Sequence, residues 1–109
     1  MVARRLFPVL VVLMTASACA SSTLPRPVEG DAEALARDGA TVSLAELEQG
    51  RDLTARSCGG CHALKSPHAL PPAEWPSAVE SMRTKQGVVL SDAEAATIVA
   101  YLQGVALRP

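Results

Sequence analysis

The stretch Cys58-Gly59-Gly60-Cys61-His62 has the spacing C-x-x-C-H, in which two residues separate a pair of thiols and an imidazole follows directly. This is the pattern of c-type haem attachment. Thiols one helical turn apart can bond the two vinyl-derived carbons of one haem, and the adjacent histidine can ligate the iron. The two glycines allow the backbone to approach the macrocycle closely. The motif therefore predicts one covalent haem c, attached through Cys58 and Cys61 and ligated by His62.

Two other sites that use paired cysteines fit this chain less well. A thioredoxin-like dithiol needs a β-α-β setting, and no alternating, β-branched run is long enough for a strand. A structural zinc site needs four ligands, whereas the third cysteine, Cys19, lies at a processing site and the other histidine is His68. Three cysteines, an odd number, also disfavour a disulfide-stapled scaffold. Haem attachment therefore explains the motif best.

The composition favours a core that contains a cofactor. The chain has 109 residues, enough for one small domain, and 49% of them are apolar, but only 3% are aromatic. Short helices with so few large side chains bury little apolar surface, and a haem would supply the missing volume. The 10 Lys and Arg are balanced by 11 Asp and Glu. Nucleic-acid binding is not expected, because it needs concentrated positive charge.

Residues 1–18 have the order of a secretory signal peptide. Arg4-Arg5 precedes the apolar run Leu6–Met14, and small residues follow up to Ala18. A membrane-spanning anchor is the alternative, but the apolar run is about half of the roughly 20 residues that such a helix needs. We therefore expect the segment to be removed on export, with cleavage before Cys19.

Cys19 is a candidate lipidation site. Ala16-Ser17-Ala18-Cys19 resembles the lipobox of bacterial lipoproteins, although that family usually has Leu where Ala16 stands. Diacylglycerol on the thiol and an acyl chain on the amine would give the two-signal anchoring that stable membrane attachment requires. Ordinary cleavage that leaves Cys19 unused is the alternative, but a lone exposed thiol would be reactive in an oxidising compartment. The resemblance implies the periplasmic face of a Gram-negative membrane, and Ala20 in place of Asp favours the outer membrane.

The mature chain is expected to consist of a tether and one helical domain. Residues 21–30 are rich in Pro, Ser and charge and have no period, which predicts a flexible tether, assigned to residues 19–42. Within it, the Ala-rich stretch from 31 to 40 could hold a short helix. Residues 43–109 form the predicted haem domain, whose fold class is all-α with about three helices around the haem.

Two of these helices are predicted by capping boxes. Ser43 with Glu46 opens a helix that runs to Ser57, so that Cys58 falls at its C-terminal end. Ser91 with Glu94 opens the last helix. The residues that this last helix is expected to bury are Ala95, Ile98, Tyr101 or Leu102, and Val105.

The middle helix is predicted over residues 73–86. Pro71-Pro72 precedes it and Gly87 follows it. Steps of four and three place Trp75, Val79 and Met82 on one face.

Residues 44–107 resemble a small class I, single-haem cytochrome c. Gly50, eight residues before Cys58, matches the glycine of that family's N-terminal helix, and Tyr101 matches the aromatic residue of the C-terminal helix that crosses it. A close helix crossing needs a small residue opposite a large one. Thr54 departs from the family, which often has an aromatic residue there. The resemblance implies an electron carrier, not an enzyme, with a redox donor and a redox acceptor protein as partners.

The ligand opposite His62 separates the possible functions. The resemblance implies a thioether, which raises the potential and suits electron transfer. Met1 and Met14 leave with the signal peptide, so Met82 is the predicted distal ligand, although it could also be a gap-filling core residue. His68 is the rival ligand, or simply a loop residue. An open or weakly held sixth position would instead suit a haem-based sensor or gas-binding protein, and a structural or assembly lipoprotein with an incidental haem is a third alternative.

Neighbouring residues have predicted supporting roles. A backbone carbonyl of Pro67, Pro71 or Pro72 could accept the imidazole Nδ1–H and orient the ring. Arg83 and Lys85 could meet haem propionates or an acidic redox partner. A charged helix end in water explains these two side chains equally well.

Overall fold

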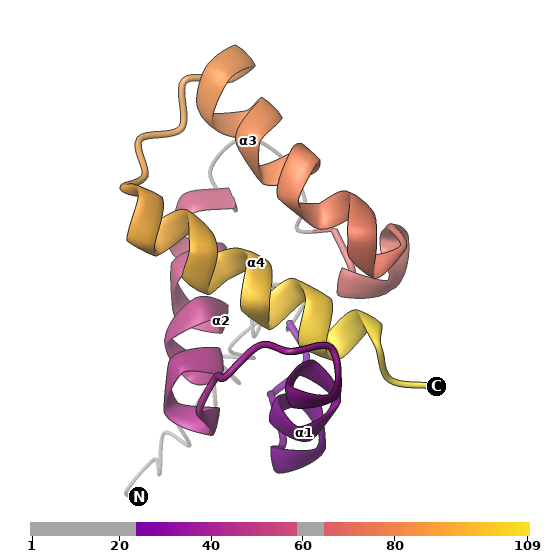
Figure 1. The fold of residues 1–109 in the computed structure, drawn as a ribbon. Coiled ribbons are helices and arrows are strands. Elements are labelled where there is room, and N and C mark those ends of the chain that lie inside the picture. Colours follow the sequence, from indigo (N-terminus) through magenta and orange to yellow (C-terminus); the bar gives the residue numbers. More distant parts are fainter. Residues whose placement is uncertain (1–23, 59–64) are drawn as a thin grey trace, which may run out of the picture.

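The computed structural model describes residues 24–58 and 65–109, and all regular structure within these ranges is helical (Figure 1). The elements in chain order are α1 (Glu29–Arg37), α2 (Leu44–Cys58), the 3-10 helices η1 (Pro67–Ala69) and η2 (Pro72–Glu74), α3 (Trp75–Lys85) and α4 (Asp92–Ala106). The all-α prediction is confirmed for the described residues. None of their helices is long and apolar enough to span a membrane.

Both predicted capping boxes are formed. The N–H of Glu46 donates to Ser43 Oγ at 3.1 Å, and the N–H of Ser43 donates to Glu46 Oε2 at 3.4 Å. At the start of α4, Ser91 and Glu94 exchange the same two bonds at 3.0 Å each. Each box satisfies two N–H groups that a helix start leaves without a partner, so α2 and α4 begin within one residue of the predicted positions.

Helix α4 is the central element, and it contacts α1, α2 and α3 (Figure 1). All the residues that it was predicted to bury are buried, with Tyr101 and Leu102 both inside. Ile98, Tyr101 and Val105 are fully enclosed, as is Leu47 of α2. The core therefore lies mainly between α4 and the helices on either side of it.

Helices α2 and α4 cross closely at Gly50. A Cβ atom at this position would lie 2.4 Å from the carbonyl oxygen of Thr97 and 2.7 Å from Tyr101 Cβ. No real side chain tolerates such distances, so the crossing requires glycine. The predicted meeting of Gly50 and Tyr101 is confirmed.

The segment before α2 differs from its prediction as a flexible tether. From residue 24 onward it packs on the helices: Leu24 is 5% exposed and Leu35 is 3% exposed. Most of the Ala-rich stretch lies in α1, which ends at Arg37, and the chain turns away at Gly39, where φ is +90°. The N–H groups of Gly39 and Ala40 bond back to the last turn of α1, as in a Schellman motif. The tether prediction is therefore corrected for residues 24–42, because Leu24, Pro27 and Leu35 pack on the helices. Residues 19–23 lie outside the described residues.

Helix α3 begins two residues later than predicted, because η2 occupies residues 72–74. Trp75 is 2% exposed and Val79 is 3% exposed, and both pack against α4 in the main core. Met82 lies one turn further along the same face and is half-buried. The predicted face is thus confirmed, with Met82 at its outer end.

Candidate functional site

Cys58 is the last residue of α2, where the capping and spacing arguments placed it. Its side chain is half-buried, and burial raises the pKa of the thiol above its ordinary value. The thiol is therefore protonated at neutral pH and lies at the boundary between core and surface. Cys61 and His62 of the motif, and the proposed lipidation site Cys19, lie outside the described residues.

Met82 lies at the edge of the core, near the end of α3. Its carbonyl oxygen accepts the N–H groups of Gln86 and Val88, both at 3.2 Å. Gly87, with φ at +69°, makes this close return of the chain possible. The backbone at Met82 is thereby fixed, while its side chain is less enclosed than the two core residues that precede it on the same face.

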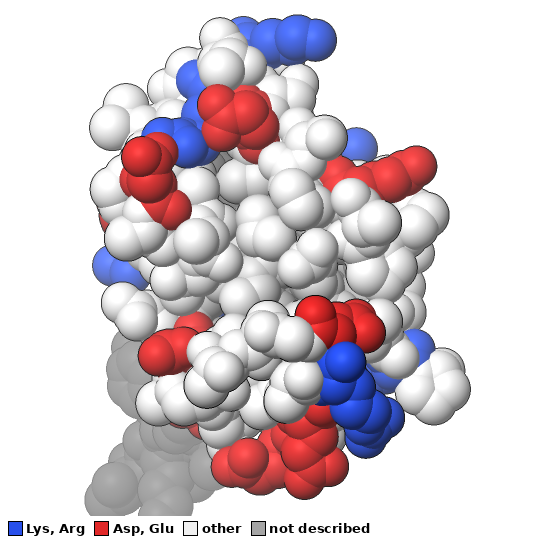
Figure 2. Space-filling model, viewed as in Figure 1, with Lys and Arg blue, Asp and Glu red and all other residues white. Residues whose placement is uncertain are grey.

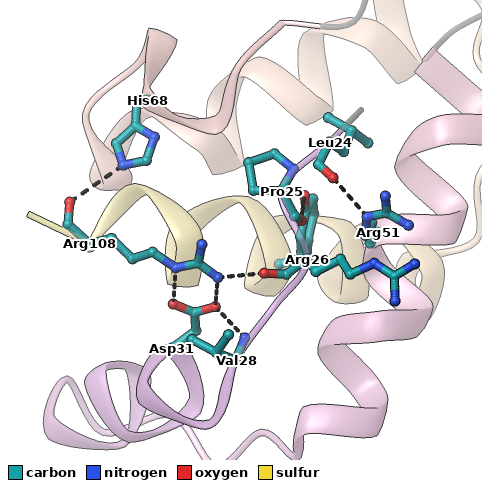
Figure 3. A network of polar contacts seen from close by, with 9 residues as sticks. Leu24, Pro25, Arg26, Val28, Asp31, Arg51, His68 and Arg108 are labelled. Atoms are coloured by element: carbon teal, nitrogen blue, oxygen red, sulfur yellow. Dashed lines mark hydrogen bonds and ion pairs between the residues drawn. The ribbon is translucent and has the colours of Figure 1, made fainter. Parts of the chain in front are cut away.

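His68 lies on η1 and its side chain is exposed. Its N–H donates to Ser66 Oγ at 3.2 Å, which caps this short helix. The ring lies against the end of the chain, where Nε2 is 3.4 Å from the carbonyl oxygen of Arg108 (Figure 3). His68, the alternative distal ligand, thus lies beside the C-terminal end of α4.

The three proline carbonyls proposed to orient the imidazole all accept hydrogen bonds in the described chain, and that of Pro72 accepts two, one of them from the N–H of Trp75. The other donors are Trp75 Nε1 to Pro67 at 2.9 Å, Gln103 Nε2 to Pro72 at 3.0 Å, and the Glu74 N–H to Pro71 at 3.0 Å. A carbonyl oxygen has two lone pairs, so those of Pro67 and Pro71 retain capacity for a second donor, whereas that of Pro72 already has two. The side chains from α3 and α4 hold the segment 67–72 in place.

Sequence reasoning missed this positioning role for Trp75 and Gln103. Trp75 was predicted only to share one helix face with Val79 and Met82. A buried indole N–H needs an acceptor, and this requirement was the available signal. Nothing in the pattern of α4 distinguished Gln103, whose partner is 31 positions away.

Arg83 is engaged within the chain. It bonds Glu80 at 3.1 Å and Asp92 at 2.8 Å, and so links α3 to the start of α4. The hydrogen bond with Asp92 is the main cause that raises the pKa of Arg83. Lys85 is exposed. Arg83 therefore already has two carboxylate partners within the chain, and a role toward haem propionates or an acidic partner stays a prediction.

Charged side chains of both signs are mixed on the face shown in Figure 2, and they surround a middle region over α4 that carries none. The residues of α4 that are exposed or half-buried include Ala96, Val99 and Ala100. This face therefore has no large field of one sign. Within residues 24–58 and 65–109, no three His, Cys, Asp or Glu side chains form a group that could hold a metal ion.

No protein-family model matches the chain, and no curated protein or solved structure matches it. Function must therefore be inferred from the motif at residues 58–62, from the helix that presents Cys58, and from the residues packed around that helix end.

Proposed function

We propose that this chain is an exported c-type cytochrome that carries single electrons between a redox donor and a redox acceptor protein. The observation that carries the proposal is the C-x-x-C-H motif, whose first residue, Cys58, is also the last residue of α2. Cys58 and Cys61 would hold the haem through thioether bonds, and His62 would ligate the iron. When bound, the haem supplies a centre that accepts and releases one electron.

The chemistry of the described residues supports such a group. The thiol of Cys58 is half-buried, so it borders the core and remains within reach of a macrocycle. Met82, the proposed distal ligand, offers a thioether from a fixed backbone position at the edge of the core. The Gly50 crossing of α2 and α4 is the arrangement that the class I resemblance implies, and it supports that resemblance without depending on the haem.

Export and membrane attachment belong to the same proposal. A signal peptide over residues 1–18 would deliver the chain to the periplasm, where covalent haem attachment and lipidation of Cys19 would follow. The chain would then be anchored at the periplasmic face, with the outer membrane favoured. Its role would be that of a carrier that serves larger redox enzymes.

Covalent attachment is tested by denaturing the purified protein and asking whether haem remains on the polypeptide. We expect it to remain on the parent chain and to be lost from the double variant Cys58→Ala/Cys61→Ala. A parent chain that releases its haem, or never contains any, would overturn the proposal.

The distal ligand is tested by the visible spectrum of the ferric protein. We expect the weak long-wavelength band that reports sulfur on ferric haem in the parent and in His68→Ala, and its loss in Met82→Ala. Thr84→Ala, an exposed position on the same helix, is the matched control. A high-spin parent that rapidly binds carbon monoxide would contradict the carrier and favour the sensor, whereas a low-spin parent without the band would indicate His68.

A further inference from the structure

The residues 24–28, here called the strap, are fixed to the helical domain through their backbone (Figure 3). Three consecutive carbonyl oxygens accept hydrogen bonds from side chains of different parts of the fold. The pairs are Arg51 Nε to Leu24 at 2.9 Å, the Tyr101 hydroxyl to Pro25 at 2.6 Å, and Arg108 Nη2 to Arg26 at 2.6 Å. Burial raises the pKa of Tyr101 to about 12, so its hydroxyl remains a donor.

An ion pair between the half-buried Arg108 and a buried carboxylate holds the other end of the strap. The Asp31 carboxylate is 2% exposed and accepts Arg108 Nε at 2.7 Å, and its Oδ2 also accepts the Val28 N–H at 2.8 Å. Leu24 and Pro27 are buried, and the two prolines of the strap restrict its backbone further. The strap is thus bound at both ends and along its length.

This attachment limits how far the helices can lie from Cys19. Only Ala20 to Thr23 stand between Cys19 and the strap. In any conformation, the Cα atoms of Cys19 and Leu24 are at most about 18 Å apart. If the tether continued to residue 42, the first residue of the folded domain could lie roughly 85 Å from Cys19.

We propose that the strap holds the domain against the surface of a lipid bilayer, with the strap side toward the membrane. The inference rests on the proposed lipidation of Cys19, but it does not require the haem. Tyr101 and Arg108, which bind the strap, lie in and beyond the last two turns of α4, whereas Val89 precedes this helix and is 95% exposed. The end of the molecule that carries Met82 and Val89 then faces the aqueous phase, where a redox partner can reach it.

The test measures the distance of two labelled positions from the membrane. The complete lipoprotein, purified with its haem, is reconstituted into vesicles of phosphatidylethanolamine and phosphatidylglycerol that contain a nickel-chelating lipid. A nitroxide is attached to Arg26→Cys or, in a second protein, to Val89→Cys. Vesicles loaded with zinc instead of nickel correct for relaxation by the ferric haem. We expect nickel to relax the label at position 26 several-fold more strongly than the label at position 89.

Two variants test whether the short tether and the bound strap cause the difference in relaxation between the two labels. About ten Gly and Ser residues inserted between Ser21 and Ser22 lengthen the tether and should abolish the difference between the two labels. The double variant Asp31→Asn/Arg108→Gln frees one end of the strap and should reduce the difference, with circular dichroism to show that it folds. Equal relaxation at the two positions in the parent, or a difference that survives the insertion, would overturn the inference.

The same preparation distinguishes this inference from the proposed electron carrier. A protein that contains haem but stays in solution would overturn the inference and the lipidation, while leaving the carrier intact. Labelling of Cys58 or Cys61 would show that haem is not attached through them and would overturn the electron carrier. The relaxation of the labels at positions 26 and 89 would still decide the inference on the strap.

Discussion

At Gly50 a single hydrogen atom determines how closely α2 and α4 approach. Gly50→Ala would place a methyl group 2.4 Å from the Thr97 carbonyl oxygen and 2.7 Å from Tyr101 Cβ, so the helices must move apart. We expect the free energy of unfolding, measured in urea, to fall by about 2–3 kcal/mol. Gly30→Ala is the control, because a Cβ there meets nothing within 4 Å and should be tolerated. Equal effects at the two glycines would contradict the close crossing.

Asp31 should make the free energy of unfolding depend on pH in the acidic range. Burial alone raises its pKa, but the bonds from Arg108 and the Val28 N–H, with the charge of Arg108, bring it below the ordinary value of 3.8. The unfolded chain therefore takes up this proton first as the pH falls. The stabilisation is complete above about pH 4 and is lost as the pH falls through the lower pKa of the folded state.

The unfolding free energy of Asp31→Asn, measured from pH 7 to pH 2, should accordingly be lower than that of the parent at neutral pH. Its fall below about pH 4 should be shallower than that of the parent. Asp38→Asn, at an exposed position just after α1, serves as the control. A parent and an Asp31→Asn variant with parallel pH profiles would show that this carboxylate does not stabilise the strap.

At the scale of the element, the cap of α4 should affect the whole fold, since α4 contacts the other three α-helices of the described chain. Ser91→Ala removes the acceptor of the Glu94 N–H and should cost about 1 kcal/mol of stability. The midpoint of thermal unfolding measures this loss. Ser77→Ala, at an exposed position of α3, is the matched control, and a loss of the same size there would argue against a specific role for the cap.

The elements that the sequence predicted well are those with local signals. Each capping box joins two residues that are three positions apart, Ser43 with Glu46 and Ser91 with Glu94. A short stretch of sequence therefore contains the whole interaction. The start of α3 was less predictable, because η2 turns the chain just before Trp75. The placement of the start of α3 depends on the hydrogen bond from Trp75 to Pro67. The periodicity of the sequence does not predict this bond.

At the scale of the whole molecule, the strap was missed because its contacts are distant in sequence. Tyr101 bonds a carbonyl 76 positions away, and Arg108 reaches Asp31 and Arg26 over 77 and 82 positions. Pro and Ser in residues 21–30 indicated flexibility, and only the folded chain shows which groups bind the backbone of the strap. The position of Cys58 was predictable, since it follows from the helix that precedes it.

Loss of the haem should destabilise helix α3 more than helices α2 and α4. Helices α2 and α4 carry fully buried side chains, among them Leu47, Ile98 and Val105, and the strap is bonded to the same two helices. Helix α3, by contrast, carries the half-buried Met82 proposed as an iron ligand. The double variant Cys58→Ala/Cys61→Ala, which cannot attach haem, should therefore unfold at lower urea concentration while keeping α2 and α4 partly protected.

Hydrogen exchange of individual amides measures this difference. We expect the amides of α3 to exchange at least about tenfold faster, relative to those of α2 and α4, in the haem-free variant, which corresponds to ~1.4 kcal/mol of lost local stability. Met82→Ala keeps both thioether bonds but removes the proposed iron ligand, so the amides of its α3 should also exchange faster than those of the parent. Acceleration of the same size in every helix would mean that the haem supports one cooperative core and that α2 and α4 have no independent stability.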